Sequence, residues 1–163
     1  MQTKHLFLIF LFALGFGFSA KAQDYHSAIG LRLGYPASIS YKHFISEPGA
    51  IEAFLGFRSY RYYRWMNIGG LYEHHMPITG ADGLNWYVGG GASLFFWNYK
   101  DNFPDNEDGN TSFGVLGAIG LDYKFANAPL NVSVDWLPVF FVNGYGNGFA
   151  GGYGALSVPY TIN

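Results

Sequence analysis

The chain has 163 residues, of which 20% are aromatic and only 12% are charged, and its formal net charge is -2 at pH 7. Charged residues make up about 25% of an average soluble domain, so this composition is unusual for one. The acidic balance argues against nucleic acid as a partner, and the absence of cysteine excludes disulfides and thiolate metal sites.

Residues 1–22 have the pattern of a secretory signal peptide. A short basic start precedes an apolar run over 6–18, and Ala20-Lys21-Ala22 is an A-x-A cleavage site. The apolar run is shorter than the roughly 18 residues that a membrane-spanning helix needs. We therefore expect a cleaved signal peptide, a mature chain that starts at Gln23, and a single domain over 23–163.

The mature chain divides into eight amphipathic segments, each close to the roughly 9 to 11 residues that a tilted membrane strand needs. Large apolar residues alternate with small or polar ones, most clearly from Phe113 to Trp136. Open sheet edges leave backbone groups unsatisfied in hydrocarbon. The sequence therefore predicts an all-β fold, an eight-stranded antiparallel up-and-down transmembrane β-barrel. The expected strands cover residues 26–35, 37–46, 50–60, 65–76, 84–97, 112–125, 130–142 and 148–158.

The connections alternate in character, as they do in single-chain outer-membrane barrels. The turns predicted to face the periplasm are 46–49, 77–83 and 126–129. The connections predicted to face outward are 35–36, 61–64, 98–111 and 138–147.

Parity along each predicted strand assigns its side chains to two faces. The apolar face, with residues such as Leu31, Ile68 and Val134, is expected to contact lipid. The opposite face carries four cations and four carboxylates, a balance that suits a narrow filled interior because unpaired buried charges are costly. We expect these charges to stabilise the interior and not to line a conducting path. The predicted interior charge network consists of Arg32, Lys42, Glu52, Arg58, Glu73, Asp122, Lys124 and Asp135.

Aromatic residues gather near both ends of the predicted strands. We expect them to form girdles at the two membrane–water interfaces, and the alternative is that they are ordinary core aromatics. The predicted outer girdle consists of Tyr35, Tyr60, Tyr62, Tyr63, Trp65, Trp97, Tyr99, Phe140 and Phe141, and the inner one of Trp86, Tyr123 and Phe125.

The pair His74-His75 and the acidic segment 101–108 are the two candidates for chemistry. Adjacent strand residues point to opposite faces, so the two histidines cannot chelate one ion, and we expect them near the periplasmic rim. The acidic segment lacks EF-hand spacing, which favours a solvated loop over a calcium or lipopolysaccharide-cation contact. The sequence therefore predicts no catalytic, metal-binding or cofactor-binding residue, and no cofactor.

The long connection over 98–111 places apolar residues among carboxylates at the outer rim. Loops beyond about 12 residues in compact folds are usually functional or disordered. We expect an extracellular protein partner, if there is one, to bind this connection together with neighbouring rim residues. The candidate surface consists of Arg61, Arg64, Tyr99, Asp101, Phe103, Asp105, Glu107, Asp108 and Tyr145.

Five stretches of the mature chain carry a family resemblance. They are Gly30–Pro36, Leu71–Glu73, Asn85–Gly89, Gly120–Phe125 and Asp135–Pro138. The whole mature chain resembles the small OmpA/OmpX-type eight-stranded outer-membrane barrels, most closely the group described as outer membrane protein beta-barrel domain, and these stretches carry the resemblance. These motifs mark architecture and carry no catalytic residues.

The resemblance implies a place in the outer membrane of a Gram-negative cell and a structural, adhesive or surface-interaction role. It implies outer-membrane lipid, lipopolysaccharide and the barrel assembly machinery as partners. Two alternatives stay open: an enzyme that modifies lipid A acyl chains, and a soluble periplasmic lipocalin-like binding barrel, which would invert the two faces. One departure from the family is the C-terminus: such barrels usually finish on an aromatic residue, typically Phe, whereas this chain ends Val158-Pro159-Tyr160-Thr161-Ile162-Asn163. Pro159 also cannot donate to a strand ladder, which leaves open how the last strand closes against the first.

Overall fold

The computed structural model describes residues 26–61, 63–99, 110–144 and 148–162. The predicted signal peptide over 1–22 and the mature N-terminus at Gln23 lie outside these residues. No helix among them is long and apolar enough to cross a membrane.

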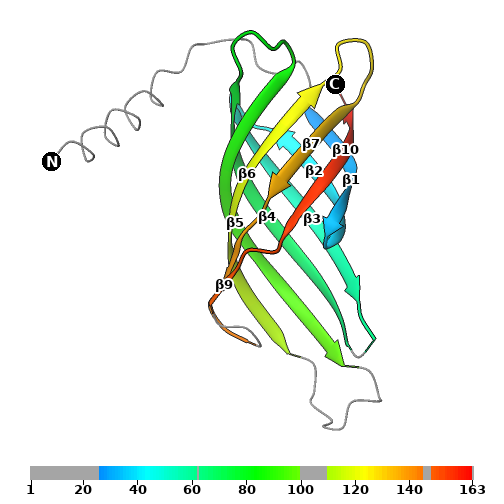
Figure 1. Ribbon diagram of the computed structural model, residues 1–163, viewed down its shortest axis with the longest axis vertical. Coiled ribbons are helices and arrows are strands. Elements are labelled where there is room, and N and C mark those ends of the chain that lie inside the picture. Colours follow the sequence, from blue (N-terminus) through cyan, green and yellow to red (C-terminus); the bar gives the residue numbers. More distant parts are fainter. Residues whose placement is uncertain (1–25, 62, 100–109, 145–147, 163) are drawn as a thin grey trace, which may run out of the picture.

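Ten β segments form one closed antiparallel barrel with eight strand positions (Figure 1). Each position pairs with its neighbours in sequence, and the pairings of β5 with β6 and of β1 with β10 complete the ring. The predicted eight-stranded antiparallel barrel is confirmed. The segments are β1 (Ser27–Tyr35), β2 (Ala37–Phe44), β3 (Gly49–Ser59), β4 (Tyr63–Pro77), β5 (Leu84–Tyr99), β6 (Thr111–Lys124), β7 (Asn131–Trp136), β8 (Val139–Phe141), β9 (Gly148–Ala150) and β10 (Gly154–Ile162).

Two strands that were predicted to be continuous are interrupted. The predicted strand over 130–142 divides into β7 and β8 at Pro138, which has no N–H for the ladder but whose carbonyl accepts a hydrogen bond of 2.9 Å from Gly117. The predicted strand over 148–158 divides into β9 and β10, and between them the Tyr153 carbonyl accepts a bond of 3.0 Å from Leu137 N–H. The wall of the barrel stays hydrogen-bonded across this pair of breaks.

Pro159 lies within β10 and does not prevent closure. The ladder between β1 and β10 runs without a gap from Ser27 opposite Ile162 to Tyr35 opposite Gly154. Gly30 stands opposite Pro159, and a Cβ at position 30 would lie 2.5 Å from the proline Cα. Closure of the last strand, which the sequence left open, is therefore complete, because a glycine on the facing strand leaves room for the proline ring.

The side chains alternate between an apolar outer wall and a largely polar interior. Leu31, Ile68 and Val134 on the outer wall are 57%, 53% and 52% exposed, whereas Asn67 and Ser133 inside are buried. The burial pattern follows the parity of the sequence along β1 to β10, and large apolar side chains are exposed at every strand position.

An aromatic cluster fills the half of the interior that lies toward the connection between β5 and β6. Trp65 and Phe95 pack at its centre with ring centroids 5.5 Å apart, and Tyr153 contacts both. The predicted girdle is wrong for five residues that point inward instead. Aromatic character does not distinguish a lipid-facing from an interior position, whereas strand parity does. The five residues are Tyr35, Tyr63, Trp65, Trp97 and Phe141.

Phe54 on β3 packs against Gly69, which stands opposite it on the neighbouring strand β4 and where a Cβ would overlap the aromatic ring. At the neighbouring Gly70, on the outer wall, a Cβ would meet no atom nearer than 3.9 Å. Gly69→Ala should therefore lower the free energy of unfolding by about 1 to 3 kcal/mol through overpacking, and Gly70→Ala should change it by about 0.5 kcal/mol or less. Urea titration of the two refolded variants, followed by tryptophan fluorescence, measures the difference. Equal effects would contradict this interior packing.

Candidate functional site

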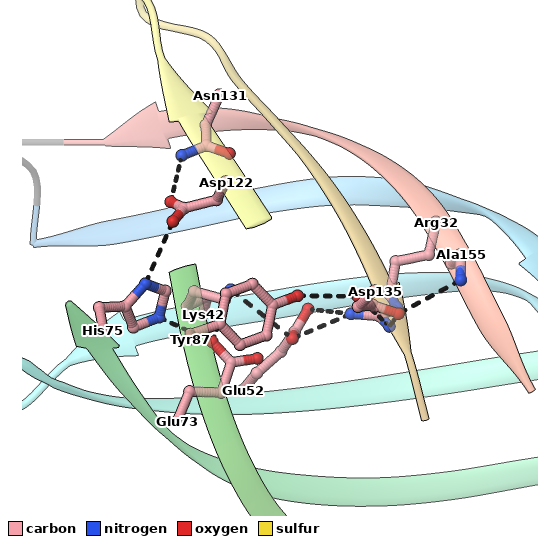
Figure 2. A network of polar contacts seen from close by, with 10 residues as sticks. All are labelled: Arg32, Lys42, Glu52, Glu73, His75, Tyr87, Asp122, Asn131, Asp135 and Ala155. Atoms are coloured by element: carbon pink, nitrogen blue, oxygen red, sulfur yellow. Dashed lines mark hydrogen bonds and ion pairs between the residues drawn. The ribbon is translucent and has the colours of Figure 1, made fainter. Parts of the chain in front are cut away.

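Arg32 on β1 is the centre of an ion network that occupies the other half of the interior, toward the three short turns (Figure 2). Its Nη1 donates to both carboxylate oxygens of Glu52 at 3.0 Å, and its Nη2 donates to both oxygens of Asp135 at 2.9 and 2.8 Å. The side chain is only 4% exposed. Two carboxylates thus hold one guanidinium from both sides, because β3 and β7 lie on opposite sides of the barrel.

Lys42 on β2 extends the network toward β4. Its Nζ lies 2.7 Å from a carboxylate oxygen of Glu73 and 3.8 Å from one of Glu52. The same ammonium lies 4.8 Å from the centroid of the Tyr87 ring, and the Tyr87 hydroxyl donates to Asp135 at 2.9 Å. The network therefore closes into a loop that joins β1, β2, β3, β5 and β7.

His75 on β4 lies close to a short turn, and its side chain points into this network. Nε2 lies 2.9 Å from Glu73 and Nδ1 lies 3.3 Å from Asp122, which also accepts a bond of 2.9 Å from the amide of Asn131. The ring is fully buried. His75 has the same parity as Glu73, so its side chain points inward although β4 ends only two residues later. His74 points to the opposite face.

The contacts of His75 decide the charge balance of the interior. Both ring nitrogens face carboxylates, and only an imidazolium can donate at both. In that form three cations, Arg32, Lys42 and His75, face four carboxylates in the described interior. Neutral donors from Tyr87 and Asn131 supply further hydrogen bonds to the carboxylates. Buried charges are tolerated when they are paired and hydrogen-bonded in this way.

The structure brings six of the eight predicted interior charges together and places two elsewhere. Arg58 lies at the opposite end, with its guanidinium carbon 4.9 Å from the centroid of Tyr35 and 5.1 Å from that of Tyr60. Lys124 is the last residue of β6 and is partly exposed. The six are Arg32, Lys42, Glu52, Glu73, Asp122 and Asp135.

Reasoning from the sequence missed three members of the network, His75, Tyr87 and Asn131. Each has the parity of an interior residue on its own strand, as Glu73, Asn85 and Ser133 do. Parity extended to histidine, tyrosine and asparagine would have placed all three inside.

The predicted outer-rim surface is described only in part. Arg61 in the turn between β3 and β4 and Arg64 at the start of β4 are exposed, and Tyr99 is the last residue of β5. The other members, Asp101, Phe103, Asp105, Glu107, Asp108 and Tyr145, lie outside the described residues.

A cavity of about 20 Å³ lies between the ion network and the aromatic cluster, lined by residues that include Arg32, Asn67 and Tyr153. This volume accommodates about one water molecule. No group of three or more His, Asp or Glu side chains in the described ranges is arranged to hold a metal ion. The chemistry of the site is mutual neutralisation of buried charge by side chains from opposite parts of the wall.

Comparison with known proteins adds no relative: no family model, no curated protein and no solved structure matches the chain.

Removing the His75 ring should weaken the barrel more than removing its neighbour. His75→Ala leaves Glu73 and Asp122 without the donor that joins them, so we expect the free energy of unfolding to fall by about 3 kcal/mol. His74→Ala, on the opposite face, should change it by about 0.5 kcal/mol or less. Denaturant titrations of the two refolded variants provide the comparison, and a small effect in both would remove His75 from the stabilising network.

Proposed function

We propose that this protein is a non-enzymatic outer-membrane β-barrel with a structural, adhesive or surface-interaction role, and that its filled lumen is not a pore. One observation carries the proposal. The closed barrel has a continuous apolar outer wall around an interior that contains its buried ions. A soluble barrel would carry the reverse distribution, with its charges on the outside.

The extent of the apolar wall supports a lipid environment. On β6 alone, Phe113, Val115, Ile119 and Leu121 face outward and are 37% to 47% exposed, and every other strand position contributes residues of the same kind. Soluble monomers rarely expose contiguous apolar patches of more than a few hundred Å². A wall of this kind is stable where hydrocarbon and not water surrounds it.

Aromatic side chains support a membrane boundary near the short turns. Tyr41, Tyr72, Tyr123 and Tyr160 face outward there from β2, β4, β6 and β10, with 39% to 53% of each side chain exposed. Tyrosine favours the interface because its ring is apolar and its hydroxyl is polar.

The strand lengths support a second membrane boundary at the end of the barrel where β1 and β2 stop. The hairpin of β1 and β2 ends at Pro36, whereas β3 to β6 continue further in the same direction (Figure 1). Ala37 at the start of β2 pairs with Phe57, and beyond it Arg58 and Ser59 of β3 pair with β4. Because backbone groups in hydrocarbon must be hydrogen-bonded within the protein, the bilayer core is expected to surround the part in which all eight positions are paired.

The interior supports a filled barrel. The aromatic cluster occupies one half of it and the ion network the other, and an eight-stranded barrel is only wide enough for its own side chains. The lipid A alternative gains no support from the histidines, because all four in the described part, His26, His43, His74 and His75, lie toward the short turns and not toward the proposed outer leaflet.

Cell fractionation tests this proposal directly. The protein should sediment with the outer membrane and should migrate differently in detergent gels before and after heating, because a closed barrel resists unfolding by detergent at room temperature. Recovery of folded protein from the periplasm without detergent would reject the proposal in favour of a soluble barrel.

Arginine on the outer wall should have a cost that depends on depth in the bilayer. Val134→Arg lies near the middle of the wall and should lower the free energy of unfolding in lipid vesicles by about 2 to 4 kcal/mol, whereas Thr111→Arg, at the start of β6, should cost about 1 kcal/mol or less. Thr111 is exposed on the same face, so the pair isolates depth. Denaturant titrations in vesicles measure both, and equal costs would contradict the proposed position of the membrane.

A further inference from the structure

Three polar side chains form a row across neighbouring strands on the outer wall, at the end of the barrel that lies toward the connection between β5 and β6. Register places Ser59 of β3 opposite Arg64 of β4, and Arg64 opposite Asn98 of β5. All three residues are exposed. The row lies two residues beyond Phe57, the last residue of β3 that pairs with β2.

Two apolar rows lie directly below this polar row on the same three strands. Phe57 stands opposite Met66, which stands opposite Phe96, and Leu55, Ile68 and Leu94 form the next row in the same way. Met66 and Ile68 are 38% and 53% exposed on the outer wall. A hydroxyl, a guanidinium and an amide thus lie above six apolar side chains.

The wall is hollowed where the polar row meets the first apolar row. A groove of about 400 Å³ is lined there by Phe57, Ser59, Arg64, Met66 and Asn98, among others. The groove therefore has a polar end that can donate hydrogen bonds and an apolar end that continues down the wall.

Three arginines lie at this end of the described chain. Arg58, Arg61 and Arg64 lie within the end of β3, the turn and the start of β4. Of the described carboxylates, Glu47 and Asp82 are in turns at the opposite end and the other four belong to the interior network, while the acidic segment 101–108 lies outside the described residues. Arg64 gives the groove a guanidinium fork, and such a fork fits two oxygens of a phosphate.

We propose that this groove binds an anionic lipid of the surrounding leaflet. Arg64 holds the lipid phosphate, with Ser59 and Asn98 as flanking hydrogen-bonding groups, and an acyl chain lies along Phe57, Met66 and Ile68. The site rests on the proposed function, because the acyl chain needs the barrel wall to face hydrocarbon. It goes beyond that function by naming the headgroup chemistry and the residues that recognise it.

Native mass spectrometry of the full barrel, folded in zwitterionic detergent micelles, tests the site. Phosphatidic acid and phosphatidylcholine with identical acyl chains are the two lipid probes, and inorganic phosphate is the third. The wild-type protein should retain phosphatidic acid about tenfold more tightly than phosphatidylcholine, and Arg64→Gln should remove most of that difference. Arg61→Gln is the matched control, because it removes a cation from the same rim outside the groove, and it should change the affinity by about twofold or less.

A second variant keeps the test independent of Arg64. Ser59→Asp places a carboxylate in the polar row and should also weaken retention of phosphatidic acid, while retention of phosphatidylcholine stays the same. Inorganic phosphate at millimolar concentration should not displace the lipid, since it cannot use the apolar rows.

Three results would overturn the inference. Equal losses in Arg61→Gln and Arg64→Gln would indicate diffuse rim charge. Unchanged retention in Arg64→Gln and Ser59→Asp would leave the groove without a role, and displacement by inorganic phosphate would indicate a phosphate site and no lipid site. Each of these can occur in a heat-modifiable barrel that sediments with the outer membrane, so failure of this inference is distinguishable from failure of the proposed function.

Discussion

The pairing of one buried guanidinium with two carboxylates constrains the whole barrel. Arg32 reaches Glu52 on β3 and Asp135 on β7, and Ala155 N–H on β10 donates to the same Asp135. Removing the partners of a buried charge lowers the free energy of unfolding several times more than removing the partner of a surface charge. Because side chains alternate along a strand, a one-residue shift of β1 would turn Arg32 to the outer wall and leave both carboxylates unpaired. The ion network therefore fixes the register in which the barrel closes.

Packing and electrostatics are joined at Tyr87. Its ring, from β5, lies against Gly120 on β6, where a Cβ would be 2.5 Å from the ring. This close approach lets the Tyr87 hydroxyl reach across β6 to Asp135 on β7. The same ring faces the ammonium of Lys42. A glycine on β6 thus helps to position one carboxylate of Arg32, so the small residues of the wall and the charges of the interior depend on each other.

The placement of the charges leaves the outer wall apolar. The described charges are either paired inside the barrel or lie near its two ends, so the wall between the ends is left to apolar side chains. The level at which β1 and β2 end coincides with the change from the apolar row at Phe57 to the polar row at Arg64. This coincidence of strand pairing with polarity supports both the proposed membrane position and the proposed lipid groove, since each needs a boundary at that level.

The sequence by itself determined the strands and their two faces, because the period of two is a local property that each segment carries alone. It placed Arg32, Glu52 and Asp135 inside for the same reason. The tertiary structure decided what local pattern leaves open. Trp65 packs against Phe95 and Trp97 of the neighbouring strand, and His75 binds Asp122, a residue 47 positions away. Pro159 is accommodated by Gly30 on the facing strand. Each of these outcomes depends on a partner from another strand, and only closure of the barrel brings such partners together.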